Sequence, residues 1–414
     1  MYNIILDNIQ IEKNKVFYNI SYSKELNFYF KSNQLFFEYE EDMSNVPISI
    51  LSIPFIATFW GISWMENCNI YVPELDETYY YSLREVRAAY QDMYYKTRLM
   101  GRVVPCKIVR NKIPLSEKAL LLFGGGVDAH ASYIRNKEQI SEIINIQGWY
   151  NQFTDIDEAA NADKRHCEEF AKRMNIQFNY IRCNFASIIN SKYFNQKYRK
   201  ILGDEWWHGI QHSVAFISIA IVMAYKHNIS NIIIGSSCTI GQIKPCNSYI
   251  TTDSAFKFAL NGNVVHDAFE LNRQQKVAVI VNYQKKVQNP YPLKVCSFKD
   301  RNCCTCEKCF RTMIEIIAEN GDVRNFGFPI EESLISFFPK MLDKHIGLWG
   351  IDFERTIYWK DTFVRMEENY QNLNEKDFVD WILKYDFDKS HHKSLRNYYR
   401  QNFFSILKRK LKIG

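Results

Sequence analysis

Hydrophobic and polar residues alternate over much of the first hundred positions. Runs such as KVFYNISYS, LNFYFKS and QLFFEYEE repeat with a period of two and are rich in aromatic residues, which is typical of antiparallel strands. The later segment LDETYYYSLREVRAAYQDMYYKTRLMG begins with acids and ends with bases, as expected of a helix aligned with its own dipole. These patterns predict a β-rich N-terminal domain over residues 1–110.

Strands and helices alternate from about residue 118. We expect strands at ALLLF, INIQGW, FNYIRCNF and NIIIGSS, and helices at HASYIRNKEQISEII, DKRHCEEFAKRMN and HSVAFISIAIVMAYKHN. This alternation predicts a doubly wound parallel sheet, which binds ligands at the carboxyl ends of its strands. The α/β domain is expected over residues 111–318, followed by a helical C-terminal extension over 319–414.

One uncharged stretch, Ser44–Met65, is long enough to span a bilayer. Pro47, Pro54, Gly61 and several hydroxyls interrupt it, so a buried strand followed by a core helix is the favoured interpretation. The N-terminus shows no basic and apolar secretory pattern. Eleven cysteines, four of them in one short segment, favour metal ligation in a reducing compartment over disulfides. We therefore expect a cytoplasmic protein.

Charge changes the picture only at the C-terminus. The chain has a formal net charge of +6, and its last residues, Ser394–Gly414, mix aromatic and aliphatic side chains with many cations. Such a segment is typical of a basic amphipathic helix on an anionic membrane surface or on RNA. The default interpretation is a terminal helix without a partner, and nucleic acid is not the favoured partner.

A glycine loop, ALLLFGGGVDAHAS, joins an expected strand to an expected helix. Gly124-x-Gly126-x-x-Ala129 satisfies the dinucleotide fingerprint, but Asp128 would repel a pyrophosphate that lacks a metal ion. No acid ends the second strand, where Gln147-Gly148-Trp149 stands, and no Gly-Lys-Ser/Thr follows to make a Walker A loop. A glycine turn without a ligand is the remaining structural alternative.

The order of strand, Gly-Gly-x-Asp and helix resembles the pyrophosphate loop of the ATP pyrophosphatases, whose pattern is Ser-Gly-Gly-x-Asp-Ser. Gly125, Gly126 and Asp128 match it, whereas Gly124 and Ala129 replace its two serines. The resemblance implies Mg–ATP bound at Gly124–Asp128: glycines let backbone N–H groups approach phosphate, and the aspartate can hold Mg²⁺. We assign His130 and Trp149 to the same nucleotide site, His130 as a partial replacement for a lost hydroxyl.

A cysteine cluster is the second motif. Cys303-x-x-Cys306-x-x-Cys309, with Cys296 seven residues upstream, supplies four thiolates at spacings that close a tetrahedral site. Zinc is the expected metal, and an iron–sulfur cluster is the alternative.

Glycine loop and cysteines together resemble the 7-cyano-7-deazaguanine synthase branch of the ATP pyrophosphatases, over about residues 118–315. The resemblance implies an adenine nucleotide alpha hydrolase-like fold, adenylation of a carboxylate by ATP, attack by ammonia, and a structural zinc. Two departures indicate another substrate. Cys304 replaces the glycine usual after the first cysteine of the triplet, and Trp206–His212 does not match the substrate-binding stretch of that branch.

Further site residues are expected between the last strand and the cysteines. Glu270, Arg273 and Lys276 recur at intervals of three, which predicts one shared helix face. We assign Arg273 and Lys276, with Asp128, to catalysis, because cations there would stabilise the leaving pyrophosphate; a solvated face with internal ion pairs is the alternative. The residues assigned to substrate binding are His208, Gln211, Asp253, His266, Asp267 and Glu270.

Together the motifs predict an ATP-dependent, AMP-forming enzyme that uses ATP, Mg²⁺ and Zn²⁺ and activates a carboxylate or carbonyl of a small molecule for attack by ammonia or an amine. A non-catalytic nucleotide- or RNA-binding relative with a degenerate loop is one alternative. An NAD(P)-dependent oxidoreductase is the other.

Overall fold

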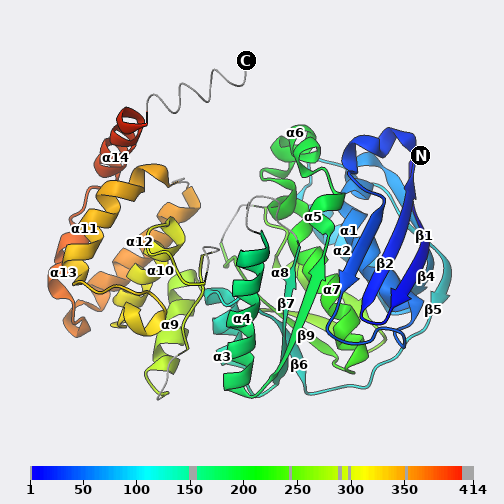
Figure 1. The fold of residues 1–414 in the computed structure, drawn as a ribbon, viewed down its shortest axis with the longest axis horizontal. Coiled ribbons are helices and arrows are strands. Elements are labelled where there is room, and N and C mark those ends of the chain that lie inside the picture. The colour runs from blue at the N-terminus through cyan, green and yellow to red at the C-terminus, as the bar shows by residue number, and fades with distance from the viewer. Residues whose placement is uncertain are drawn as a thin grey trace. The chain divides into compact units, whose positions relative to one another are not determined.

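The computed structural model describes residues 2–148, 156–241, 245–287, 291–296, 300–349 and 353–402. The chain divides into two compact units, Met1–Asn272 and Arg273–Gly414. Within the described residues every strand lies in the first unit and in one eleven-stranded sheet, and the second unit is helical (Figure 1).

The first unit contains both long and very short elements. Its strands are β1 (Tyr2–Glu12), β2 (Lys15–Tyr22), β3 (Gln34–Glu38), β4 (Cys68–Asp76), β5 (Val103–Val109), β6 (Ala119–Leu122), β7 (Ile140–Gln147), β8 (Gln177–Cys183), β9 (Asn231–Gly235), β10 (Lys257–Phe258) and β11 (Gly262–Asp267). Its helices are α1 (Ile48–Glu66), α2 (Glu77–Met93), α3 (Val127–Asn136), α4 (Ile156–Met174), α5 (Phe185–Ile188), α6 (Ser191–Leu202), α7 (His212–Lys226) and α8 (Ile250–Asp253), with a 3-10 turn η1 (Lys24–Tyr29) and a π-helical turn η2 (Trp207–Gln211).

Five neighbouring strands form a parallel core in the order β11-β9-β6-β7-β8. Chain order therefore reverses between β6 and β9, as in a doubly wound sheet. Helices α3 and α4 lie on one side of these strands and α7 on the other (Figure 1), as right-handed crossovers require. The predicted α/β class with a large, mostly parallel sheet is confirmed.

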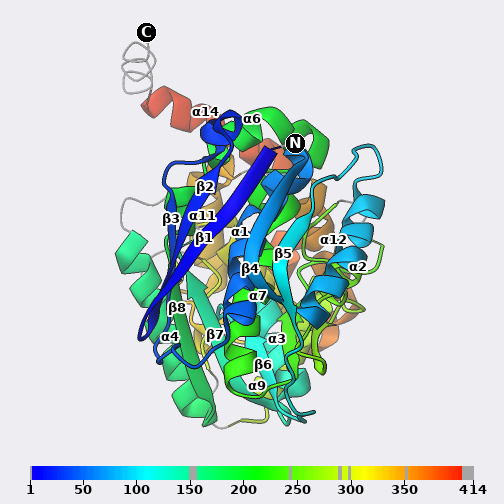
Figure 2. The same ribbon diagram turned by 90° about the vertical axis from the view of Figure 1, so that its right-hand side faces the viewer.

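The N-terminal strands extend this sheet. β3 pairs antiparallel with β8, through Phe37 opposite Cys183, and is followed by β2, β1, β4 and β5 (Figure 2). Two of the three expected runs, KVFYNISYS and QLFFEYEE, form the antiparallel strands β2 and β3, but the expectation of a strand at LNFYFKS is wrong, because most of this run forms the 3-10 turn η1. Strands β4 and β5 run parallel to β1. β3 supplies backbone partners to a β8 edge that would otherwise be open. The two compact units divide after Asn272, and the domain boundaries expected near 110 and 318 stay predictions.

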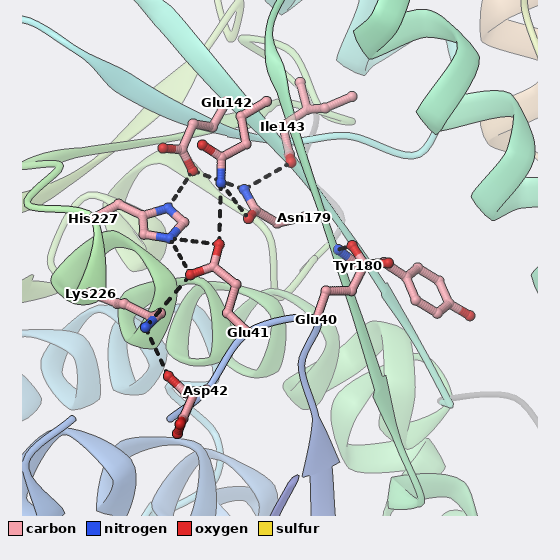
Figure 3. A network of polar contacts seen from close by, with 10 residues as sticks. Glu40, Glu41, Asp42, Glu142, Ile143, Asn179, Tyr180, Lys226 and His227 are labelled. Atoms are coloured by element: carbon pink, nitrogen blue, oxygen red, sulfur yellow. Dashed lines mark hydrogen bonds and ion pairs between the residues drawn. The ribbon is translucent and has the colours of Figure 1, made fainter. Parts of the chain in front are cut away.

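Polar side-chain contacts connect the residues after β3 to the parallel core of the sheet (Figure 3). His227, which follows α7, makes contacts of 2.7 Å to Glu142 Oε2 on β7 and 3.1 Å to Glu41 Oε1 after β3. Lys226 donates to the Asp42 carbonyl, and Lys164 Nζ lies 2.7 Å from Glu40 Oε1. The hydrogen bond to Glu142 is the main cause that raises the pKa of His227 above its ordinary value.

Most of the uncharged stretch 44–65 forms helix α1, which begins at Ile48, and the buried strand expected before the helix is absent, since Pro47 is the N-cap. Two helical stretches, Ile48–Glu66 and Trp207–Lys226, are long and apolar enough to cross a membrane, but 89% and 78% of their apolar windows are buried in the protein. α1 and α7 pack against each other, which is the behaviour of core helices.

The second unit consists of helices around an aromatic core. They are α9 (Arg273–Gln284), α10 (Glu307–Ala318), α11 (Leu334–His345), α12 (Phe353–Glu368), α13 (Lys376–Leu383) and α14 (Phe387–Gln401), with short 3-10 turns η3 (Val323–Phe326), η4 (Ile346–Leu348) and η5 (Tyr370–Asn372). Phe310 of α10 is fully buried and contacts the rings of four other aromatic residues: Phe338, Trp349, Trp359 and Phe387.

Candidate functional site

The glycine loop leaves β6 and leads directly into α3. Gly125 has φ +76°, a left-handed conformation that favours glycine, and Gly126 is the N-cap of α3 without a capping side chain. A β-carbon on Gly124 or Gly126 would meet no atom within 4 Å, so both glycines border open space. The first N–H groups of a helix have no partner within the helix. The loop can therefore offer backbone donors to an anion.

The loop lies at the topological switch point of the sheet, because it follows β6 and its neighbour β9 belongs to the other half. Ligands of open α/β sheets bind in this crevice. At the end of β9, Gly235 allows a close approach: a β-carbon there would lie 2.7 Å from the Asp128 carbonyl oxygen and 2.9 Å from Ser132 Oγ. Gly235 thus sets how close α3 comes to the sheet.

Asp128 and His130 occupy different sides of the loop. Asp128 lies in the first turn of α3 and is partly exposed, whereas His130 is only 3% exposed and packs against Phe123 and Phe170. Its Nδ1–H donates to the Gly126 carbonyl at 3.0 Å. Burial lowers the pKa of His130 to about 4, so a neutral imidazole supports the loop from inside. Trp149, also assigned to the nucleotide, lies outside the described residues.

Two predicted substrate residues, Asp253 and His266, form a buried pair. Asp253 ends α8 and His266 lies near the carboxyl end of β11, and both side chains are fully buried. His266 Nδ1 lies 2.8 Å from Asp253 Oδ2, which also accepts from Ser248 Oγ at 2.9 Å. His266 Nε2 has no hydrogen-bond partner among the described residues. An Asp–His pair of this kind orients an imidazole for proton transfer.

Asp267 and Glu270 both bind Arg135, from the last turn of α3. Arg135 Nε lies 3.3 Å from both Asp267 carboxylate oxygens, and its Nη2 lies 2.6 Å from Glu270 Oε1. The prediction that Glu270 shares a helix face with Arg273 and Lys276 is wrong. Ala268, at φ +61°, turns the chain after β11, and α9 begins only at Arg273.

The stretch 206–212 forms the π-helical turn η2 and the start of α7. His208 is exposed on this turn. Gln211 is fully buried, and its amide donates to the Ala57 carbonyl of α1 at 2.6 Å. Burial lowers the pKa of His212 to about 3. Gln211 thus faces the interior, and only His208 of the two predicted substrate residues is on the surface.

The predicted catalytic cations Arg273 and Lys276 lie on α9. Arg273 Nε donates to Glu315 Oε1 at 2.9 Å, and its Nη2 lies 3.2 Å from Thr312 Oγ1 on α10. Glu315 is fully buried, and desolvation raises its pKa. Lys276 is only 2% exposed. Arg273 thus makes an ion pair with α10, but this pair is largely buried and Lys276 is buried, so the solvated face considered as the alternative is not present either.

The four predicted metal ligands come together at the amino end of α10. The Sγ atoms of Cys296, Cys303, Cys306 and Cys309 all lie within 4.8 Å of one another, and Cys303 Sγ is 3.8 Å from Cys309 Sγ. Zinc–sulfur bonds of about 2.3 Å in a tetrahedron place sulfurs about 3.8 Å apart. The cluster therefore has dimensions compatible with zinc.

The loop between these ligands contains a residue with an unusual backbone conformation. Cys304 adopts φ +57°, the left-handed region in which glycine is normal. Its side chain is 6% exposed, and burial raises the pKa of its thiol to about 12. Cys304 is therefore a neutral, buried neighbour of the four ligands. The Thr305 N–H, in turn, lies 3.5 Å from Cys303 Sγ and can donate to a thiolate there.

Sequence reasoning missed three residues around the glycine loop. Gly235 permits the approach of α3, Arg135 holds Asp267 and Glu270, and Asn145 of β7 donates to the Phe123 carbonyl at 3.1 Å. A polar residue within the apolar run of β7 and a glycine that ends β9 were available signals. Neither pattern names its partner, because both contacts join segments far apart in sequence.

A cavity among the described residues lies away from the glycine loop. It measures about 720 Å³, lies between α2 and residues 245–255, and is lined by Glu85, Asp92 and Tyr249 among others. Phosphate is commonly bound by backbone N–H groups at the start of a helix. The position of the glycine loop in the strand order and the open space at its glycines therefore indicate a phosphate site better than cavity volume does.

No family model matches the chain, and no curated protein matches its sequence.

Proposed function

We propose that this protein is an ATP-dependent, AMP-forming enzyme that adenylates a carboxylate or carbonyl of a small molecule for attack by ammonia or an amine. One observation carries the proposal: a Gly-Gly-x-Asp loop opens α3 at the switch point of a doubly wound sheet, with open space at Gly124 and Gly126. The resemblance of this loop and the cysteine cluster to the 7-cyano-7-deazaguanine synthase branch supplies the reaction type.

The loop residues would bind the triphosphate. Backbone N–H groups from Gly124 to Asp128 would contact phosphate oxygens, assisted by the positive end of the α3 dipole. Asp128 would hold Mg²⁺, which supplies charge neutralisation for the leaving pyrophosphate. Because Gly124 and Ala129 lack the hydroxyls of the related pattern, backbone donors carry more of the phosphate binding in this chain.

His266 is our candidate for the proton acceptor of the incoming amine, and this role would require its side chain, which is fully buried here, to become accessible to substrate. The Asp253 carboxylate accepts from His266 Nδ1–H at 2.8 Å, and this fixes the tautomer whose basic nitrogen is Nε2. That nitrogen lies near the carboxyl end of β11, the edge of the sheet at which such folds bind substrate. His208, Asp267 and Glu270 remain predictions for substrate contact.

Zinc is the metal proposed for the four cysteines. A site closed by four thiolates keeps no open position, so zinc would brace residues 296–309 and take no part in the reaction. Reduced thiols in such a site require a reducing compartment, and we propose the cytoplasm.

The test compares wild type with Asp128→Asn in a thermal-shift titration against Mg–ATP, α,β-methylene ATP and NADH. A ligand that binds the folded state raises the melting temperature. The proposal requires a shift by both ATP ligands that depends on Mg²⁺ and on Asp128. A shift by NADH alone supports the oxidoreductase, and a shift by none of the three ligands contradicts nucleotide binding.

A second assay separates an enzyme from a binding protein. Exchange of labelled pyrophosphate into ATP, screened over a set of small carboxylates, reports adenylation directly. The two missing hydroxyls favour a non-catalytic relative, for which Mg–ATP would bind and no carboxylate would support exchange.

A further inference from the structure

The positive charge of the chain is concentrated at its C-terminal end. The full sequence has 52 Lys and Arg against 46 Asp and Glu. Eight of these cations and none of the acids lie from Lys389 onward, which leaves 44 cations against 46 acids in the preceding residues. The net charge of +6 is therefore a property of α14 and the residues that follow it.

Helix α14 is anchored to the helical unit along one face. Ser394 is buried, and a β-carbon on Gly347 of η4 would lie 2.2 Å from the Leu395 backbone nitrogen. Phe387, at the start of α14, makes tilted ring contacts with Trp359 and Phe363. These contacts explain why the helix forms, and they leave the opposite face to solvent.

The opposite face is basic and aromatic. Its exposed positions, which we call the basic face, recur with helical spacing: Lys389, His392, Lys393, Arg396, Tyr399 and Arg400. Tyr399 is 54% exposed and its neighbour Tyr398 is 37% exposed. Among the basic-face cations the described contacts include a single acidic partner, Asp343, which lies 3.0 Å from Lys393 Nζ. The face thus presents several cations and an amphipathic ring together.

We propose that the basic face of α14 binds an anionic membrane surface. Lys and Arg clusters on an amphipathic helix are attracted to acidic headgroups, and tyrosine suits the interface between headgroups and acyl chains. The sequence after the helix, FFSILKRKLKIG, alternates bulky apolar residues with four more cations. Aliphatic Ile and Leu at these positions fit an acyl boundary, whereas RNA is recognised chiefly by cationic, polar and aromatic side chains.

The test measures co-sedimentation of the full chain with vesicles of phosphatidylcholine alone and of phosphatidylcholine mixed with phosphatidylserine, at low and high salt. R396A/R400A is the test variant. R84A/R102A is its control, because it removes two exposed arginines that lie outside α14. Each cation near an anionic surface contributes about fivefold to partitioning, so we expect the test variant to bind roughly 25-fold more weakly.

Binding that requires phosphatidylserine, falls with salt and is lost only in R396A/R400A supports the proposal. Equal binding to neutral vesicles contradicts it, and so does no binding at all. A parallel titration with single-stranded poly(U) covers the other anionic partner: if RNA binds through Arg396 and Arg400 while vesicles do not, the face is an RNA surface and the membrane proposal is wrong.

Discussion

The carboxyl end of β9 and the first turn of α3 meet at Gly235 and Asp128, where a β-carbon on Gly235 would lie 2.7 Å from the Asp128 carbonyl oxygen. This contact involves backbone atoms on the α3 side, so a side chain at 235 cannot be accommodated by a rotamer change. We predict that Gly235→Ala displaces the start of α3 and lowers the free energy of unfolding by about 1–3 kcal/mol, measured by urea denaturation.

Gly124→Ala is the matched substitution on the open side of the same loop. Its β-carbon meets no atom within 4 Å, so we expect a change in stability within about 0.5 kcal/mol. A methyl group there would nevertheless stand where phosphate approaches the backbone, and the thermal shift by Mg–ATP should fall. Equal ATP shifts in wild type and Gly124→Ala would contradict the assignment of this loop.

The cysteine cluster predicts a specific pattern of metal loss. Cys306→Ser and Cys309→Ser remove one of four ligands and should abolish the one zinc per chain expected in wild type. Cys304→Ala should keep the metal, because its neutral, buried thiol is not one of the four clustered sulfurs. Mass spectrometry of the native protein measures the metal content. Iron in place of zinc would identify the alternative cluster, and metal retained in Cys306→Ser would contradict the site.

His227 predicts a pH dependence of stability with a defined sign. Its pKa is raised in the folded protein, chiefly by the hydrogen bond to Glu142 and also by Glu41. The contribution is therefore complete below the unfolded pKa of about 6.5 and is lost as pH rises through the higher folded pKa. Other charges near this contact are Lys226 and Glu40, on the same network.

The measurement is the difference in free energy of unfolding between wild type and His227→Gln at about pH 6 and about pH 9. We expect the wild type to be more stable by about 1–2 kcal/mol at the lower pH and the difference to shrink at the higher pH. His392→Gln, at an exposed histidine, is the control. The burial that lowers the pKa of His130 to about 4 acts with opposite sign in acid, and it cancels because both proteins contain His130. A difference that grows with pH would show that the ion pairs of His227 do not stabilise the fold.

Four of the five strands of the parallel core, β6 to β9, could be predicted because each contains a short apolar run next to a helical segment. The fifth strand, β11 (Gly262–Asp267), was not predicted, because its short run follows β10 directly and mixes polar with apolar residues. The attachment of the N-terminal strands could not be predicted, since β3 and β8 pair across about 145 residues and alternation along one strand does not name its partner. The same limit applies to the uncharged stretch 44–65. Its composition suits a buried helix and a buried strand equally, and only its packing against α7 in the structure identifies it as a core helix.

At the site, local spacing was informative where the chemistry is local. Cys303, Cys306 and Cys309 lie within seven residues, and their spacing alone predicted the cluster. Glu270, Arg273 and Lys276 do not share the predicted helix face, because Ala268 takes a left-handed conformation and α9 begins only at Arg273. The role of Arg135 could not be predicted for a different reason. A single arginine in the last turn of a helix does not indicate that its partners lie 132 and 135 residues further along the chain.

Substitutions in the Asp253–His266 pair can separate a role in catalysis from a role in stability. If the pair serves chemistry, replacing both residues by apolar ones should leave stability close to that of wild type, because two polar side chains in the interior are costly to desolvate. We expect Asp253→Leu and His266→Phe each to lower the free energy of unfolding by about 3–5 kcal/mol, since each leaves a buried polar partner unmatched. The double variant should recover most of that loss.

Urea denaturation of wild type, the two single variants and the double variant gives the coupling energy between the two residues directly. Mg–ATP thermal shifts on the same samples show whether the substitutions affect nucleotide binding. The loop that would bind nucleotide leaves β6, whereas the pair lies at β11 and α8, so the double variant should keep the ATP-induced shift while losing any carboxylate-dependent turnover that wild type is found to catalyse. A double variant less stable than both single variants would instead make the pair a structural element. In that case Asp253 and His266 would hold α8 against β11, and the proton acceptor for the amine would have to be another residue.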